Sequence, residues 1–199
     1  MPQTTPLRRR SRRATRAALA LFAGVLVVAG LAAPANAERY IHRDPSRDVQ
    51  KVEFMNVDDN GFVHAPRRKQ GDVVKVKIWH QVRAVRVVGK YRQLDREGAI
   101  GQFVSIRTPD GRVHDFQVTA GPGAWKGVED DSECIIGHGV NYKRDRFSMR
   151  ISRSCLGRPR WVRVGVGVIS FTDRAIFADD AQSRRVRQNL TYSPRLKHA

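Results

Sequence analysis

The chain has 199 residues, of which 37 are Lys or Arg and 19 are Asp or Glu, so its formal net charge is +18. Hydrophobic residues make up 41% of the chain, which is enough apolar material for one core and argues against disorder throughout. Because it has only two cysteines, the sequence excludes a zinc site built from cysteines alone and a small domain held together by many disulfides.

The beginning of the chain has the three parts of a secretory signal peptide. Residues 1–16 hold six arginines and no acidic residue, residues 17–31 are an uncharged apolar run, and Ala35-Asn36-Ala37 is a small-residue cleavage site. The alternative is a membrane anchor, which needs about 20 apolar residues. Pro34 ends the run before that length. We therefore expect residues 1–37 to be a signal peptide, and a secreted or cell-wall protein that begins at Glu38 and has no transmembrane segment.

The two ends of the chain carry much of its positive charge. Without residues 1–37, the chain has 31 basic and 19 acidic residues. Residues 182–199 hold five of those basic residues and no acidic residue, and few of their side chains are apolar. The sequence therefore predicts one folded domain over residues 38–181 and a flexible, disordered basic tail over residues 182–199.

Between the two ends, short runs in which apolar and polar residues alternate are typical of an antiparallel β-sandwich, of the jelly-roll or immunoglobulin-like type. We expect hairpins over residues 73–92 and 103–119, and further strands over residues 146–153 and 161–171. In the second hairpin, Thr108-Pro109-Asp110-Gly111-Arg112 predicts a type I turn followed by a bulge. The only helix we expect is a single turn around residues 178–181.

Cys134 and Cys155 have 20 residues between them, and in an exported chain they most simply form one disulfide. The alternatives are a reactive thiol, or a metal-binding pair made by Cys134 and His138. Two ligands do not complete a metal site, and an oxidising compartment favours the disulfide.

Three short motifs resemble those of a loose group of uncharacterised exported actinobacterial proteins. They are an Asp-x-x-x-Asp-Val opening (residues 44–49), a valine-rich strand that ends in a histidine (residues 73–80), and a late Ser-Cys-Leu-Gly-x-Pro segment (residues 154–159) that leads into a valine-rich strand. The resemblance covers most of the mature chain. It implies a β-sandwich with one disulfide and supplies no catalytic residue.

The sequence contains no motif for nucleophilic catalysis, for a zinc protease or for a phosphate-binding loop. Its six histidines are scattered singly, and we expect His80, at the end of a strand, to be structural. Loop carboxylates could hold Ca²⁺, or they could lie in solvated turns: Asp58-Asp59, Asp130-Asp131, Asp179-Asp180, and Asp44 with Asp48. None matches a defined calcium loop, so we expect solvated turns, with no metal and no cofactor.

The first predicted hairpin has a basic outward side. Its side chains are Lys75, Lys77, Trp79, Arg86, Lys90 and Arg92, and Arg146 and Arg150 are expected to extend it. This side is either a solvated surface edged by acidic loops or a binding site for a polyanion, since like charges across strands favour a compensating partner. Gly165 and Gly167, on one face of their strand, allow a close approach by a backbone or a flat ligand, or mark a tight twist.

The sequence thus favours a non-enzymatic binding or structural module that is secreted or held in the cell envelope. Its expected partner is an anionic cell-wall polymer or glycan, with no specific nucleic acid. The alternative is an extracellular hydrolase whose site is assembled from separate loops. Carboxylates or histidines that meet in a deep pocket would favour the enzyme, and a flat basic face would favour binding.

Overall fold

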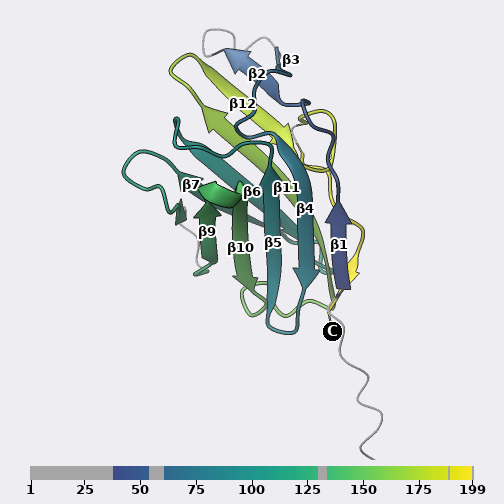
Figure 1. Ribbon diagram of the computed structural model, residues 1–199. Helices are drawn as coiled ribbons and strands as arrows, with labels where there is room; N and C mark the ends of the chain where they lie inside the picture. The colour runs from purple at the N-terminus through teal and green to yellow at the C-terminus, as the bar shows by residue number, and fades with distance from the viewer. Residues whose placement is uncertain (1–37, 54–60, 130–133, 188, 199) are drawn as a thin grey trace, which may run out of the picture. The chain divides into compact units, whose positions relative to one another are not determined.

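A computed structural model describes residues 38–53, 61–129, 134–187 and 189–198. The predicted signal peptide and the pairs Asp58-Asp59 and Asp130-Asp131 lie outside the described residues. The described chain forms two antiparallel sheets that face each other across one core (Figure 1), which confirms the predicted all-β sandwich. No described helix is long and apolar enough to cross a membrane.

The first sheet has five strands, in the order β1-β4-β5-β10-β9. Their bounds are β1 (Glu38–His42), β4 (Val73–His80), β5 (Ala84–Tyr91), β10 (Arg146–Ser152) and β9 (Gly137–Asn141). A short 3-10 helix, η2 (Tyr142–Arg144), joins β9 to β10.

The second sheet has eight strands, with the order β3-β2-β12-β11-β6-β7-β8 and with β13 also paired to β11. Their bounds are β3 (Val63–His64), β2 (Gln50–Glu53), β12 (Ala175–Asp180), β11 (Trp161–Phe171), β6 (Ile100–Arg107), β7 (Val113–Ala120), β8 (Val128–Glu129) and β13 (Leu196–Lys197).

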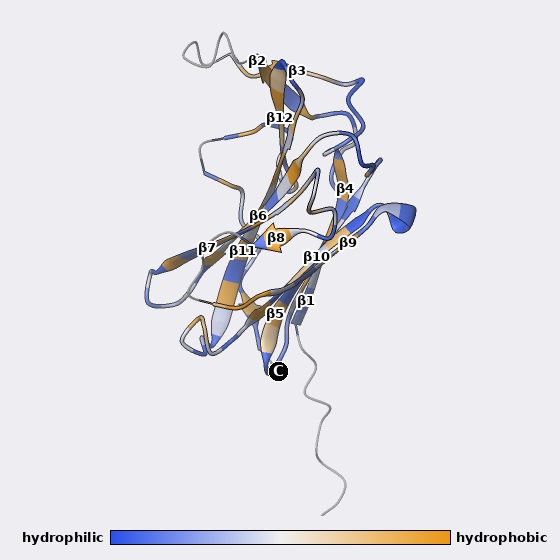
Figure 2. Ribbon diagram, turned by 90° about the vertical axis from the view of Figure 1, so that its left-hand side faces the viewer, coloured by the Kyte–Doolittle hydropathy of each residue, from blue (hydrophilic) through white to orange (hydrophobic). Residues whose placement is uncertain are grey.

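The core lies between the sheets and follows the predicted alternation, which Figure 2 shows as changing colours along the strands. Val85 and Val87 of β5 and the valine stripe of β11 are at most 2% exposed. Each such side chain contributes about 1.5–3 kcal/mol by leaving water. In β4 a bulge between Val73 and Lys75 turns Val73 inward, so Val74 is only partly buried.

The β6–β7 hairpin has the predicted turn. Gly111 N donates to Thr108 O at 3.1 Å, and Gly111 has a φ of 82°, in the left-handed region that glycine adopts without strain. Thr108 N donates to Arg112 O at 3.1 Å, which closes the bulged hairpin.

Cys134 and Cys155 form the predicted disulfide, with their Cα atoms 5.9 Å apart. This pairing excludes the free thiol and the Cys134/His138 metal pair. The bridge joins the chain just before β9 to the chain just after β10, at the base of that hairpin.

Two local predictions are wrong. The expected helical turn around residues 178–181 falls largely in β12, which pairs with β11 on one side and β2 on the other, so sheet pairing overrides the local preference. The tail over residues 182–199 is also not a loose extension where it is described. Leu196 pairs with Val162 and is 5% exposed, and Ser193 Oγ accepts a hydrogen bond from Val164 N at 3.0 Å.

Candidate functional site

The outer surface of the five-stranded sheet carries rows of cationic side chains. In one row, Arg39 of β1 lies opposite Trp79 of β4, Trp79 opposite Arg86 of β5, and Arg86 opposite Arg150 of β10. Four residues along the strands, Lys75 lies opposite Lys90, which in turn lies opposite Arg146. Alternation turns all of these side chains away from the core.

We call this surface the basic face and define it by seven residues: Arg39, Lys75, Lys77, Arg86, Lys90, Arg146 and Arg150. Directly opposite residues in an antiparallel pair are about 5 Å apart at Cα, so the face contains like charges at short range. The structure therefore brings together Lys75, Lys77, Trp79, Arg86 and Lys90 of the predicted site, with Arg146 and Arg150 as expected. Arg39, on a strand that sequence reasoning missed, extends the face further.

Two residues of the predicted site have acidic partners. Lys90 Nζ lies 2.8 Å from Asp145 Oδ2. Burial acts to raise the pKa of Asp145, but the hydrogen bonds from Lys90 and from Leu94 N, together with the positive charge of Lys90, lower it. Arg92 Nη1 lies 2.7 Å from Asp72 Oδ2, whose carboxyl group is buried. Arg92 therefore belongs to an internal ion pair and not to the basic face. Within the described part of the chain, the other six cations of the face have no ion-pair partner.

Trp79 is the aromatic member of the site. The Arg86 guanidinium lies 5.5 Å from the centre of its ring, within the range of a cation–π contact. This contact aligns the Arg86 side chain along the sheet and leaves the partly exposed Trp79 ring in the same row as Arg39 and Arg150.

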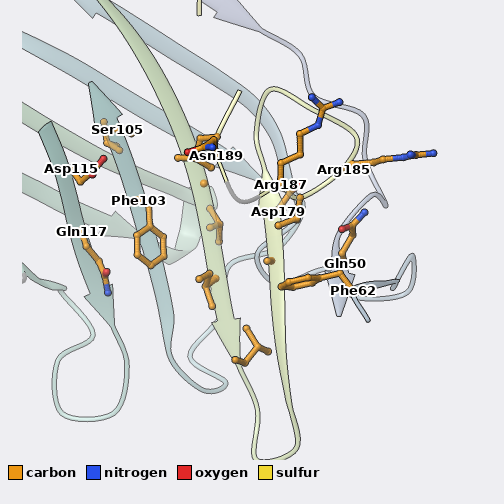
Figure 3. A pocket seen from close by; sticks show the side chains of 18 of the residues that line it. Gln50, Phe62, Phe103, Ser105, Asp115, Gln117, Asp179, Arg185, Arg187 and Asn189 are labelled. Atoms are coloured by element: carbon orange, nitrogen blue, oxygen red, sulfur yellow. The ribbon is translucent and has the colours of Figure 1, made fainter. Parts of the chain in front are cut away.

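The opposite sheet has a different outer surface, with a groove of about 1390 Å³. Figure 3 shows Phe103 and Ser105 projecting from β6, Asp115 and Gln117 from β7, and Arg185 and Arg187 from the chain after β12. Its described lining contains no histidine, and the carboxyl groups among that lining are those of Asp115, which is exposed, and Asp179, which is 3% exposed.

Gly165 and Gly167 of β11 have no side chain, which lets the chain's own tail pack closely against this strand. A Cβ atom would lie 2.9 Å from Leu190 Cβ at Gly165 and 2.7 Å from Leu190 Cδ2 at Gly167. Gly165 also forms a bridge with Tyr192. Of the alternatives open from the sequence, close approach is therefore the one observed: the backbone of the tail approaches Gly165, and the Leu190 side chain approaches Gly167.

A cluster of aspartates lies where the start of β4 meets β12. Asp44 and Asp48 come from the connection between β1 and β2, Asp72 precedes β4, and Asp179 and Asp180 end β12. All five residues are at most 8% exposed, so the prediction of solvated turns is wrong for Asp44, Asp48, Asp179 and Asp180. Val73 N donates to Asp179 Oδ2 at 2.8 Å and thereby joins the two sheets at this point.

The cluster is electrostatically strained. Burial first, and then the nearby carboxyl groups of Asp179, Asp48, Asp180 and Asp72, together raise the pKa of Asp44 to about 10. Burial also raises the pKa of Asp179 well above its usual range, and that of Asp48 and Asp180 less strongly. The Arg92 guanidinium lies at ion-pair distance from Asp72, and not from the other aspartates of the cluster. His42 Nε2 lies 3.7 Å from Asp44 Oδ1.

Comparison with protein-family models, with curated proteins and with solved structures finds no match to this chain. The resemblance to exported actinobacterial proteins therefore stays a prediction.

Proposed function

We propose that this protein is a non-enzymatic binding module of the cell exterior or envelope, and that its basic face binds an anionic cell-wall polymer. The observation that carries the proposal is the set of six cations on one sheet surface with no described acidic partner. A repeating phosphodiester or uronate chain would supply the missing negative charge along the rows, without needing a pocket.

The predicted export of the protein supports an anionic cell-wall polymer as its partner. The disulfide fits an oxidising compartment, and the features of residues 1–37 predict secretion with Glu38 as the first mature residue. In that compartment an envelope polymer is a more accessible polyanion than nucleic acid is.

The hydrolase alternative has less support. A general acid and base need exposed groups within reach of a bound substrate. The described lining of the groove offers one exposed carboxyl group, that of Asp115, while Asp179, the aspartate of the cluster that also lines it, is 3% exposed. Among the described residues that line this groove, Asp115 has no second exposed carboxyl group and no histidine to act with.

The test compares two charge-reversed variants for binding to a fluorescent polyglycerol phosphate chain. In the first, Arg86→Glu is combined with Arg150→Glu, which alters two exposed residues that face each other on the basic face. In the second, Arg185→Glu is combined with Arg187→Glu, which removes the same charge from exposed positions beside the groove. The first variant should bind at least tenfold more weakly, and the slope of log Kd against log salt should fall by about 1–2.

The control variant should keep most of the wild-type affinity, and a neutral glycan of similar length should not bind. Equal losses in the two variants would mean that net charge alone drives retention and would overturn the assignment to the basic face. Thermal melting of both variants checks that the fold is intact.

A further inference from the structure

Three of the buried aspartates are placed as ligands of one ion. One carboxylate oxygen from each of Asp44, Asp48 and Asp179 lies within 4.8 Å of those of the other two, and all three residues are buried. Two oxygens bound to one Ca²⁺ at 2.3–2.6 Å are at most about 5 Å apart, so the three oxygens fit around a single ion.

A second observation, separate from the clustering, also points to a ligand. Neither carboxylate oxygen of Asp44 or of Asp48 has a hydrogen-bond partner among the described residues, and the Asp44 side chain is 0% exposed. Buried carboxylates elsewhere in proteins are paired, hydrogen-bonded or bound to metal, because an uncompensated charge away from water is very costly. Oδ1 of Asp72, another member of the cluster, likewise has no hydrogen-bond partner among the described residues.

We propose that Asp44, Asp48 and Asp179 bind a calcium ion at the junction of the two sheets. The ligand atoms are all hard carboxylate oxygens, with no nitrogen or sulfur ligand, which suits Ca²⁺ or Mg²⁺ and not zinc or copper. Mg²⁺ keeps several of its waters, whereas a closed site of buried carboxylates favours Ca²⁺, which accepts irregular geometry and protein oxygens.

A bound ion would stabilise the junction of the two sheets. It joins the connection between β1 and β2 to β12, at the place where Val73 N already bonds Asp179 Oδ2. Binding would neutralise carboxyl groups that otherwise repel one another. This inference does not depend on polyanion binding, since the site lies inside the sandwich and the basic face lies outside it.

The test uses chelator-treated wild-type protein, Asp44→Asn, and the control Asp115→Asn, which changes an exposed aspartate outside the cluster. Calorimetric titration with Ca²⁺ alone should show one site in wild type and in the control. Asp44→Asn should weaken it at least about tenfold. Ca²⁺ should raise the Tm of wild type and the control but not that of Asp44→Asn.

A purely structural role for Asp44 makes a different prediction. In that case Asp44→Asn would lower the Tm with or without Ca²⁺. If the cluster is an empty ion site, the Asn variant should melt close to chelated wild type, because it is a near-isosteric change at a side chain with no hydrogen-bond partner among the described residues to lose, and it should melt below Ca²⁺-bound wild type.

Absence of any Ca²⁺ heat or Tm shift in chelated wild type would overturn the proposal without reference to a variant. Binding of Mg²⁺ as tight as that of Ca²⁺ would overturn the assignment to calcium.

Discussion

The imidazole of His80 is buried, and one hydrogen bond determines which ring nitrogen carries the proton. Nδ1 lies 2.8 Å from Leu196 O, so it carries the proton and donates to that carbonyl, while Nε2 has no partner among the described residues. Burial lowers the pKa of His80, and the charges of Arg153 and His198 lower it further, against opposing effects of the Leu196 bond and Glu38. The structural role expected from the sequence is therefore the one observed.

This lowered pKa predicts acid sensitivity. In the unfolded chain the imidazole takes up a proton near its ordinary pKa of about 6.5, but in the folded chain it resists protonation. The contribution of His80 to stability is therefore complete above that pH and is lost as the pH falls below it, by at most about 1.4 kcal/mol per pH unit. His80→Asn keeps a donor near the Nδ1 position and cannot titrate. Urea unfolding at pH 7 and pH 5 should show a smaller loss in the variant, and equal losses would contradict the argument.

At the scale of the element, the sequence predicted a turn or strand correctly where the pattern that determines it lies within a few neighbouring residues. The Pro109-Asp110-Gly111 turn and the alternation of β4, β5 and β11 depend on neighbours in the sequence, so they were predicted. The exception is the start of β4, where the pattern placed Val74 on the inward face with Val76 and Ile78, and the bulge turns Val73 inward instead. β12 was missed because Ala178 to Ala181 has no strand pattern of its own and gains its conformation from two neighbouring strands. β13 is two residues long, which is too short for any periodicity.

The β9–β10 hairpin should depend on its disulfide. Cys134 and Cys155 are 21 residues apart in sequence, and closing a loop of that length restricts the unfolded chain by about 3 kcal/mol. For a domain of this size, that corresponds to a fall in Tm of roughly 6–12 °C on reduction. The core strands keep their own packing, so the reduced protein should still fold. Differential scanning calorimetry with and without reductant measures the difference.

The double variant Cys134→Ser with Cys155→Ser is the control. It should melt at the temperature of the reduced wild type and should not respond to reductant. A wild type whose Tm is insensitive to reduction would show that the bridge contributes nothing to stability.

At the scale of the whole molecule, the aspartate cluster could not be predicted. Asp44 and Asp48 lie within one segment, but Asp179 is more than 130 residues away and reaches them only through the pairing of β12 with β2 and the bond from Val73 N. The sequence showed pairs of carboxylates, and nothing local distinguished a pair in a solvated turn from a pair turned inward. The basic face was predicted because one hairpin carries most of it, and Arg39 was missed because β1 joins that hairpin from the other side.

The described end of the chain packs against the core of the sandwich. Leu196 packs into the core at 5% exposed, and its carbonyl accepts the His80 bond. Leu196→Ala should therefore lower the free energy of unfolding by about 2–3 kcal/mol, through lost burial and the cavity left behind. A flexible tail would instead make the substitution neutral. Lys197→Ala is the matched control, since it changes the exposed neighbour in the same strand and should stay within about 0.5 kcal/mol of wild type. Urea denaturation of the three proteins decides between a tail that is part of the fold and one that is only attached to it.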